Sequence, residues 1–400
     1  MIDLEIKEKK DCTGCYACSN ICPENCINMK IDNEGFWYPA VDYGKCIQCK
    51  KCLKVCSVIN KFTVNSEPVA FACYNKINKI RSESSSGGIF TVIAEKIIDN
   101  DGIVFGAGFD LNFGVKHSYA QKIEELSKFR GSKYVQSFIG EAYKQTEYFL
   151  KQGKQVLFTG TPCQIEGLKS FLGLEYDNLL CMDIVCHGVP SPKVWKKYVK
   201  FREKKAGSSV KEIFFRNKNI GWKRYSMMFI FKNNTKYCKT MDKDLFMKAF
   251  LKNICLRPSC YNCIFKTLQR QSDITLADFW GIQNILPEMD DDKGTSLVFI
   301  NSLKGQAVIE EIKDRIVYKE VNIDQAVKYN SSAVESAEYN INREDFFEEL
   351  DKLPFDLLVK KYCKEPLDVR IKKSMKRSAY TVVKKIGLLN ISKKVISKLS

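Results

Sequence analysis

The sequence predicts a mixed α/β protein in three parts: a small cysteine-rich domain, a larger α/β domain and a basic helical tail. Eight cysteines recur at regular spacing within the first 60 residues. Two strand–loop–helix units follow one another at 156–172 and 179–195, and such alternation is typical of an open α/β sheet. From Arg370 to Ser400 the chain has ten Lys or Arg and no acidic residue. We therefore expect domains at 1–60, 61–345 and 346–400.

The composition is that of a globular protein of the cytoplasm. The 400 residues are 45% hydrophobic and 12% aromatic, which is enough to bury a proper core. No apolar run reaches the ~18 residues of a membrane span, and Met1–Lys10 lacks the apolar stretch of a secretory signal. Eighteen cysteines without such a signal indicate a reducing compartment.

The N-terminal cysteines form two equal runs. Each run reads Cys-x2-Cys-x2-Cys-x3-Cys, and the second follows the first at an offset of 34 residues, so the segment is an internal duplication. Three thiolates at this spacing can wrap a loop around one iron–sulfur cube, and the fourth reaches the cube of the other half. We assign one 4Fe–4S cluster to Cys12, Cys15, Cys18 and Cys56, and the other to Cys46, Cys49, Cys52 and Cys22.

The sequence between the two runs predicts a hairpin of Ile27–Ile31 and Phe36–Val41. The whole arrangement resembles the bacterial two-cluster ferredoxin domain, although Ser57 stands where a second proline usually follows the last ligand. Zinc and disulfides are the alternatives. Zinc sites usually pair Cys-x2-Cys units or include histidine, and neither histidine of the chain lies here. Disulfides would require an exported protein.

Two loops of the second domain could hold a phosphate or a flavin. Ser84–Gly88 is a Ser/Gly-rich turn before an apolar helix at 89–100, which suits a phosphate, although an ordinary helix cap explains it as well. The loop Gly131–Ser137 carries a cation and an aromatic ring, Lys133 and Tyr134. A flavin would use both, and a surface loop needs neither.

The two strand–loop–helix units predict a parallel pair of strands. The first strand leads into Thr159–Gln164, and the second leads into Cys186. Both loops should emerge at the carboxyl edge of the sheet, where open α/β sheets bind ligands, so Cys163 and Cys186 should be neighbours. With the pair Cys260 and Cys263 they could hold a third 4Fe–4S cluster. Cys255 is a rival for one place, and a zinc site of the same four cysteines is the alternative.

Six segments of the second domain share their pattern with one known family. They are 84–88, 131–137, 159–164, 186–192, 257–263 and 273–281. Together these segments resemble the coenzyme F-420 hydrogenase/dehydrogenase beta-subunit family, in the bacterial form with an N-terminal two-cluster ferredoxin. The resemblance implies an FAD-binding domain with an additional cluster beside the flavin. It places the FAD contacts on Ser84, Ser85, Ser86, Gly87, Gly88, Lys133, Tyr134, Thr159, Gly160, Thr161 and Gln164.

We therefore interpret the chain as an iron–sulfur flavoprotein oxidoreductase. A ferredoxin-like donor would deliver electrons through the clusters to FAD, which pairs them for reduction of an organic substrate. Lys133, His187 and Asp278 are candidates for proton delivery or substrate polarisation, with a structural hydrogen bond as the alternative for each. Relatives of this form often accompany surface-polysaccharide biosynthesis, which suggests a sugar-linked substrate. The family name does not imply use of the deazaflavin.

Two other functions stay open, a relay subunit that passes electrons to a separate enzyme and an interaction protein with structural clusters. The tail could support the second, because its apolar residues recur at helical spacing, and a basic amphipathic helix can lie on an anionic membrane. A helix docked on its own domain is the alternative. We expect no nucleic-acid partner, because the rest of the chain has no basic patch interleaved with aromatic residues.

Overall fold

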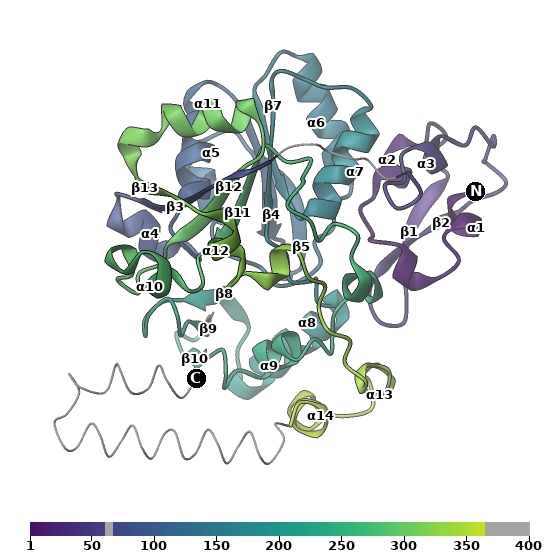
Figure 1. Cartoon of the computed structure of the whole chain (residues 1–400). Helices are drawn as coiled ribbons and strands as arrows, with labels where there is room; N and C mark the ends of the chain where they lie inside the picture. Colours follow the sequence, from purple (N-terminus) through teal and green to yellow (C-terminus); the bar gives the residue numbers. More distant parts are fainter. Residues whose placement is uncertain (61–66, 365–400) are drawn as a thin grey trace.

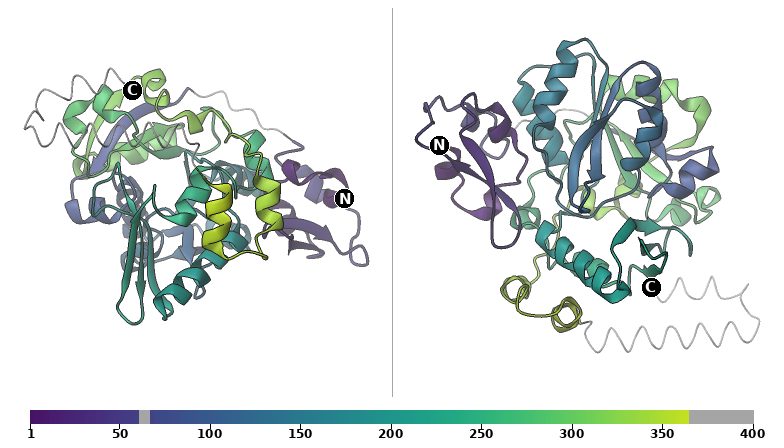
Figure 2. Two further views of the ribbon diagram at one scale, coloured as in Figure 1. Left: turned by 90° about the horizontal axis from the view of Figure 1, so that it is seen from below. Right: turned by 180° about the vertical axis from the view of Figure 1, so that it is seen from behind.

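The structure, a computed structural model, describes residues 1–60 and 67–364. The predicted basic helix at 370–400 lies outside the described residues. Within them, none of the helices combines the length and apolar character that crossing a membrane requires. The N-terminal domain lies beside one edge of the larger domain, where its helix α2 (Ala17–Ile21) packs against α6 (Ala142–Lys151) and α7 (Pro162–Leu172) (Figures 1 and 2).

The N-terminal domain is built from short helices around one hairpin. Its remaining elements are α1 (Ile2–Glu5), η1 (Lys9–Asp11), β1 (Ile27–Ile31), β2 (Trp37–Val41) and α3 (Lys51–Lys54). β1 and β2 pair antiparallel, which confirms the predicted hairpin. Gly14 and Tyr16 adopt left-handed backbone conformations, and so do Gln48 and Lys50 one repeat later. The duplication in the sequence is therefore also a duplication in the backbone.

An eight-stranded mixed sheet organises the second domain in the order β13-β3-β12-β11-β7-β6-β4-β5. Its strands are β3 (Val69–Asn75), β4 (Ile103–Phe109), β5 (Val115–Ala120), β6 (Val156–Gly160), β7 (Leu179–Ile184), β11 (Ile274–Asp278), β12 (Ser296–Ile300) and β13 (Ile316–Val321). The central strands β11, β7, β6 and β4 are parallel, and antiparallel strands flank them. The predicted parallel pair β6–β7 is confirmed, and so is the mixed α/β class.

Alternating side chains bury both faces of this sheet. Leu157 and Val298 lie in one apolar cluster with α5 (Ile89–Asp99) and α11 (Leu303–Glu311). On the opposite face, Phe158 packs with α6 and α7, and Leu297 packs with α10 (Ile282–Ile285) and α12 (Ile323–Val327). The other short elements of the domain are α4 (Asn78–Glu83), η2 (Ile123–Lys128), η3 (Pro258–Asn262), η4 (Pro287–Met289), η5 (Lys313–Arg315) and η6 (Ser331–Ala333).

A second, three-stranded sheet has its own apolar core. Its strands, in the order β10-β9-β8, are β8 (Val210–Asn217), β9 (Ser226–Phe231) and β10 (Lys236–Thr240). They pack with α8 (Pro192–Ala206), α9 (Leu245–Leu251), α13 (Arg343–Glu348) and α14 (Phe355–Tyr362). The boundary expected at residue 346 falls inside α13, and residues between 346 and 363 contribute to this core.

Candidate functional site

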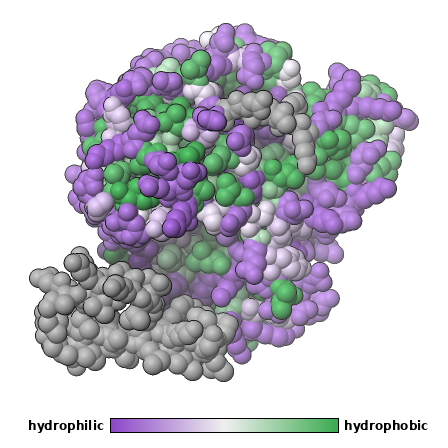
Figure 3. All heavy atoms as spheres, in the orientation of Figure 1, coloured by the Kyte–Doolittle hydropathy of each residue, from purple (hydrophilic) through white to green (hydrophobic). Residues whose placement is uncertain are grey.

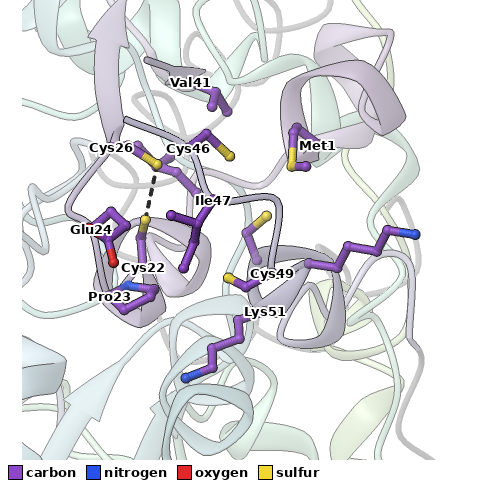
Figure 4. Close-up of a pocket in the computed structure, with 13 residues that line it drawn as sticks. Met1, Cys22, Pro23, Glu24, Cys26, Val41, Cys46, Ile47, Cys49 and Lys51 are labelled. Atoms are coloured by element: carbon purple, nitrogen blue, oxygen red, sulfur yellow. Dashed lines mark hydrogen bonds between the residues drawn. The ribbon is translucent and has the colours of Figure 1, made fainter. Parts of the chain in front are cut away.

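Two pockets of the N-terminal domain are each lined by four of the eight regularly spaced cysteines. One pocket has Cys12, Cys15, Cys18 and Cys56 on its wall. The other has Cys22, Cys46, Cys49 and Cys52, and Figure 4 shows side chains of both runs around it. These are the two sets of four that we assigned to the two clusters. Cys26 is a further thiol of the second pocket, with its Sγ 3.3 Å from Sγ of Cys22.

A third pocket lies between the two domains. Its wall includes Cys163, Cys186, Cys260 and Cys263, the four cysteines that we expect to hold a third cluster. Cys163 lies in the first turn of α7 and Cys186 follows β7; the parallel pairing of β6 with β7 places both at the same edge of the sheet. Cys255 lies elsewhere, fully buried in the apolar core of the small sheet.

The four cysteines of this third pocket are partly buried. Burial raises the pKa of Cys260 to about 12 and holds the pKa of Cys163 well above its ordinary value. A thiol in such surroundings loses its proton readily only to a positive centre such as iron or zinc. In residues 1–60 and 67–364, no three His, Cys, Asp or Glu side chains are arranged to hold a single metal ion.

The first and third pockets are neighbours across the domain boundary. Thr13 lines both of them. Gly167, on α7, approaches Cys15 so closely that a Cβ at Gly167 would lie 2.9 Å from Cys15 Cβ. The pocket that contains Cys49 is open to solvent instead, since Cys49 is exposed.

The two flavin-loop candidates near the start of the second domain meet each other. The backbone N–H of Ser132 donates to Ser85 Oγ, 2.7 Å away. The other hydroxyls of the serine turn already have backbone partners, Ser84 Oγ donating to the Ile80 carbonyl and Ser86 Oγ to the Thr295 carbonyl. Gly88 has φ 84° and precedes α5 as its cap.

Gly87 is explained by close packing within the protein. A Cβ there would lie 2.4 Å from the carbonyl oxygen of Cys73 on β3 and 2.9 Å from the backbone nitrogen of Ser296 on β12. The absence of a side chain therefore permits the turn to lie directly against the paired strands β3 and β12. This requirement is independent of any cofactor.

The loop Thr159–Gln164 is held mainly by its own helix cap. Thr161 and Gln164 form the reciprocal capping box of α7, and Pro162 takes the first helical position. Thr159 Oγ1 donates to the Phe105 carbonyl, and Gln164 Nε2 donates to Ser137 Oγ. The last contact joins this loop to the end of the Gly131–Ser137 loop. Gly160 lies against Gln164, because a Cβ there would be 3.1 Å from Gln164 Oε1.

Tyr134 and Asp278 meet at Arg216, while Lys133, next to Tyr134 in the chain, donates from Nζ to the carbonyl oxygens of Arg130 and Gly131. The Arg216 guanidinium forms an ion pair with Asp278 and donates to the Tyr134 hydroxyl at 3.3 Å. Its Nε and Nη2 atoms are buried without a hydrogen-bond partner among the described residues, so both could donate to an anion. Burial lowers the pKa of Lys133 to about 7. Trp222 completes the cluster, with Nε1 donating to Asp278 at 2.9 Å.

His187 lies apart from that cluster, next to the third cysteine pocket. Its Nε2 contacts Asn253 Oδ1 at 2.6 Å and its Nδ1 contacts Ser332 Oγ at 3.3 Å, so both ring nitrogens have neutral partners. Phe250 of α9 links the two regions: its ring stacks on Tyr134 at 4.7 Å and meets His187 edge-on at 5.3 Å.

Three basic residues outside our predicted set take part in these arrangements. Arg216 has the unpaired donors described above, and Lys218 Nζ donates to the carbonyl oxygens of Arg81, Ser86 and Lys293, which ties the serine turn to a distant loop. Arg257 bridges the domains through the Cys12 carbonyl. Arg257 lies in the same motif as Cys260, but its partners come from residues far away in the sequence, so the spacing of the motif gave no signal for its role.

Comparisons with known proteins agree with this architecture. Residues 153–326 match the family that is described as the C terminus of the beta subunit of coenzyme F420 hydrogenase/dehydrogenase, and residues 11–59 match "4Fe-4S dicluster domain". The F subunit of the F(420)H(2) dehydrogenase of Methanosarcina mazei is 20% identical over 211 residues, 49% of this chain, and the match spans 60% of that protein's length.

Two further similarities are shorter or more distant. An uncharacterized protein in the rpl9-rpl11 intergenic region of Porphyra purpurea is 31% identical over 62 residues, 14% of this chain and 79% of that protein. A chain in the F420-reducing [NiFe] hydrogenase complex from Methanosarcina barkeri superposes with a TM-score of 0.47 and 17% identity, over 72% of this chain and 94% of that chain. The chain is thus an iron–sulfur electron-transfer protein related to the beta subunits of coenzyme F420 hydrogenase/dehydrogenase, with an N-terminal 4Fe-4S dicluster domain.

Proposed function

We propose that the protein is an iron–sulfur flavoprotein oxidoreductase that takes electrons from a ferredoxin-like donor and uses FAD to reduce an organic substrate. One observation carries this proposal: four cysteines from separate elements of the second domain share a pocket with Thr13 of the dicluster domain. Cys163, Cys186, Cys260 and Cys263 are suited to a third 4Fe–4S cluster because thiolates are its usual ligands. The clusters would supply one-electron steps and FAD would pair the electrons.

The Arg216 cluster supports a flavin beside that pocket. Arg216 offers two buried N–H donors without partners among the described residues, and Lys133 adds a second cationic group. Both groups suit an anion such as the pyrophosphate of FAD. Phe250 lies between Tyr134 and His187 and is buried, so it excludes water from the path between the flavin loops and the cysteine pocket. Lys133 and Asp278 are the groups that could hold or move a proton there.

Metal and flavin analysis of anaerobically purified protein tests this proposal. We expect ~12 iron atoms, four for each of three cubes, and one FAD per chain. Cys260→Ser should lower the iron content to ~8 and keep the signals of the dicluster domain. Cys255→Ser is the matched control, since that thiol is buried outside the pocket and its loss should leave ~12 iron atoms. Wild-type protein with ~8 iron atoms and one zinc would overturn the third cluster.

A relay subunit without its own substrate is the second candidate. The observation that favours it is the match to a dehydrogenase component named as a subunit, of whose length this chain spans 60%. A sugar-linked substrate in surface-polysaccharide biosynthesis rests on the family resemblance alone. Purified protein that oxidises a reduced carrier in the presence of an acceptor dye, and releases no reduced product from any organic substrate offered, would favour the relay.

A further inference from the structure

Lysines are concentrated in one stretch of the dicluster domain. Residues 1–60 contain eight lysines and eight acidic residues, so the domain has no formal net charge. Four of the lysines nevertheless fall between residues 45 and 54, a stretch without any Asp or Glu, and all four are exposed: Lys45, Lys50, Lys51 and Lys54. The basic composition of the whole chain therefore does not explain this cluster.

Two of these lysines line the outer cysteine pocket, which is the pocket that contains Cys49. Lys50 and Lys51 line the pocket together with Cys22 and Cys49. Figure 4 shows Lys51 next to Cys49. Among the carboxylates that the structure describes, Asp42 is 3.8 Å from Lys45, and no ion pair joins any carboxylate to the other three lysines. Their charge is therefore available to a partner.

An apolar centre accompanies the cationic rim. Ile47, between the first two ligands of the second run, is 62% exposed, and Tyr43 is 53% exposed. In the space-filling view, hydrophobic residues reach the surface among hydrophilic ones on the side of the N-terminal domain (Figure 3). A small apolar centre with a charged rim is typical of transient protein contacts, in which charge guides the encounter.

The other pocket of the domain faces inward. Cys15 lies against Gly167 of α7, and the Cys12 carbonyl accepts a hydrogen bond from Arg257. Of the eight cysteines assigned to the two clusters, Cys49 is the exposed one. Of the three cysteine pockets, the outer one is therefore the pocket that a soluble partner can approach closely.

We propose that the face formed by Tyr43, Lys45, Ile47, Lys50, Lys51 and Lys54, here called the lysine face, docks an acidic one-electron carrier protein. In the encounter the reduced carrier loses one electron and the cluster held by Cys22, Cys46, Cys49 and Cys52 gains it; no bond forms or breaks. The proposal rests on the proposed function for the presence of a cluster in this pocket, and it requires neither the flavin nor the third cluster.

Stopped-flow mixing with a reduced acidic flavodoxin tests the lysine face, with oxidation of the flavodoxin as the readout. The test variant is Lys50→Glu/Lys51→Glu/Lys54→Glu. The control variant is Lys196→Glu/Lys200→Glu/Lys204→Glu, which changes the net charge equally on exposed positions of α8. At low salt the rate should fall at least ~10-fold in the test variant and stay within about twofold in the control. Added salt should slow the wild type and barely affect the test variant.

The end point of reduction by excess dithionite should be the same in all three proteins, which shows that the clusters are intact. Equal rates in the test variant and the wild type, or an equal loss in the control, would overturn the lysine face as the docking site. The same would follow if the test variant lost sedimentation with anionic vesicles but kept the flavodoxin rate, since the face would then bind membranes. Missing flavin or a missing third cluster would end the proposed function and leave this measurement unchanged.

Discussion

Arg257 donates a hydrogen bond from Nε to the carbonyl oxygen of Cys12, 2.8 Å away across the boundary between the two domains. Its Nη2 donates to the Trp37 carbonyl at 3.0 Å, and the guanidinium lies 4.2 Å from the centre of the Tyr38 ring. The side chain is fully buried, and no described carboxylate forms an ion pair with it. An isolated buried cation is costly. An anionic cluster beside Cys12 or Cys260 would balance this charge.

We predict that Arg257→Gln lowers the midpoint potentials of the clusters at Cys12 and Cys260. A nearby positive charge stabilises the reduced, more negative form, so its loss makes reduction harder. The cluster that includes Cys49 should keep its potential and serves as the internal control. Redox titration followed by electron paramagnetic resonance measures all of them separately.

Arg343→Gln is the control variant for this experiment. Arg343 also joins the domains, through a bidentate ion pair with Glu34, but its charge is already balanced there. Its removal should weaken the domain interface without moving the potentials. If both variants shift the potentials equally, the contribution of Arg257 is docking and not charge.

Gly87 provides a test of whether the serine turn is shaped by packing or by a cofactor. We predict that Gly87→Ala lowers the free energy of unfolding by about 1–3 kcal/mol, because its Cβ would meet the backbone of Cys73 and Ser296. Gly108→Ala is the control, since a Cβ there would make ordinary contacts of 3.5 Å or more. Denaturant unfolding under anaerobic conditions measures both. A variant at Gly87 that keeps full stability and loses FAD would show that the glycine serves the cofactor.

The features predicted from the sequence are those that local spacing determines. The two strand-like segments between the cysteine runs predicted the hairpin, and the alternation of strand and helix predicted the pairing of β6 with β7. The placing of Cys163 beside Cys186 followed from the rule that parallel strands end at one edge. Arg216 was noticeable only as a basic residue at the end of a strand, because its partners Tyr134 and Asp278 are 82 and 62 residues away. Packing of distant loops decides such contacts, and no local pattern records it.

We predict that breaking the ion pair of Arg216 with Asp278 greatly lowers the free energy of unfolding. Their side chains are 3% and 15% exposed. Asp278→Asn should lower the free energy of unfolding by about 3 kcal/mol or more, because it leaves the buried guanidinium unpaired. The double variant Arg216→Met/Asp278→Leu should recover most of that loss, since neither charge remains. Denaturant unfolding followed by tryptophan fluorescence measures both. If Asp278→Asn is as stable as the wild type but inactive, Asp278 acts in proton transfer rather than in the ion pair.

Lys133 predicts a pH dependence for flavin binding. Burial lowers the pKa of its ammonium group to about 7, so in the flavin-free protein the side chain is charged below that pH and neutral above it. An anionic FAD prefers the charged form and therefore raises the pKa when it binds. At a pH between the pKa of Lys133 in the flavin-free protein and its higher pKa in the complex, FAD binding takes up a proton. In that range the affinity for FAD should therefore fall by up to about tenfold per pH unit as the pH rises.

Titration of flavin-stripped protein with FAD, from about pH 6 to pH 9, measures this dependence through quenching of flavin fluorescence. The Kd of the wild type should be constant below about pH 7 and should increase above it. Lys133→Arg stays charged throughout this range, so its Kd should vary little with pH. Lys133→Met should bind FAD more weakly at low pH and show no dependence on this group. A wild-type Kd that is flat across the range, together with an unchanged Kd in Lys133→Met, would place the phosphates of the flavin away from Lys133.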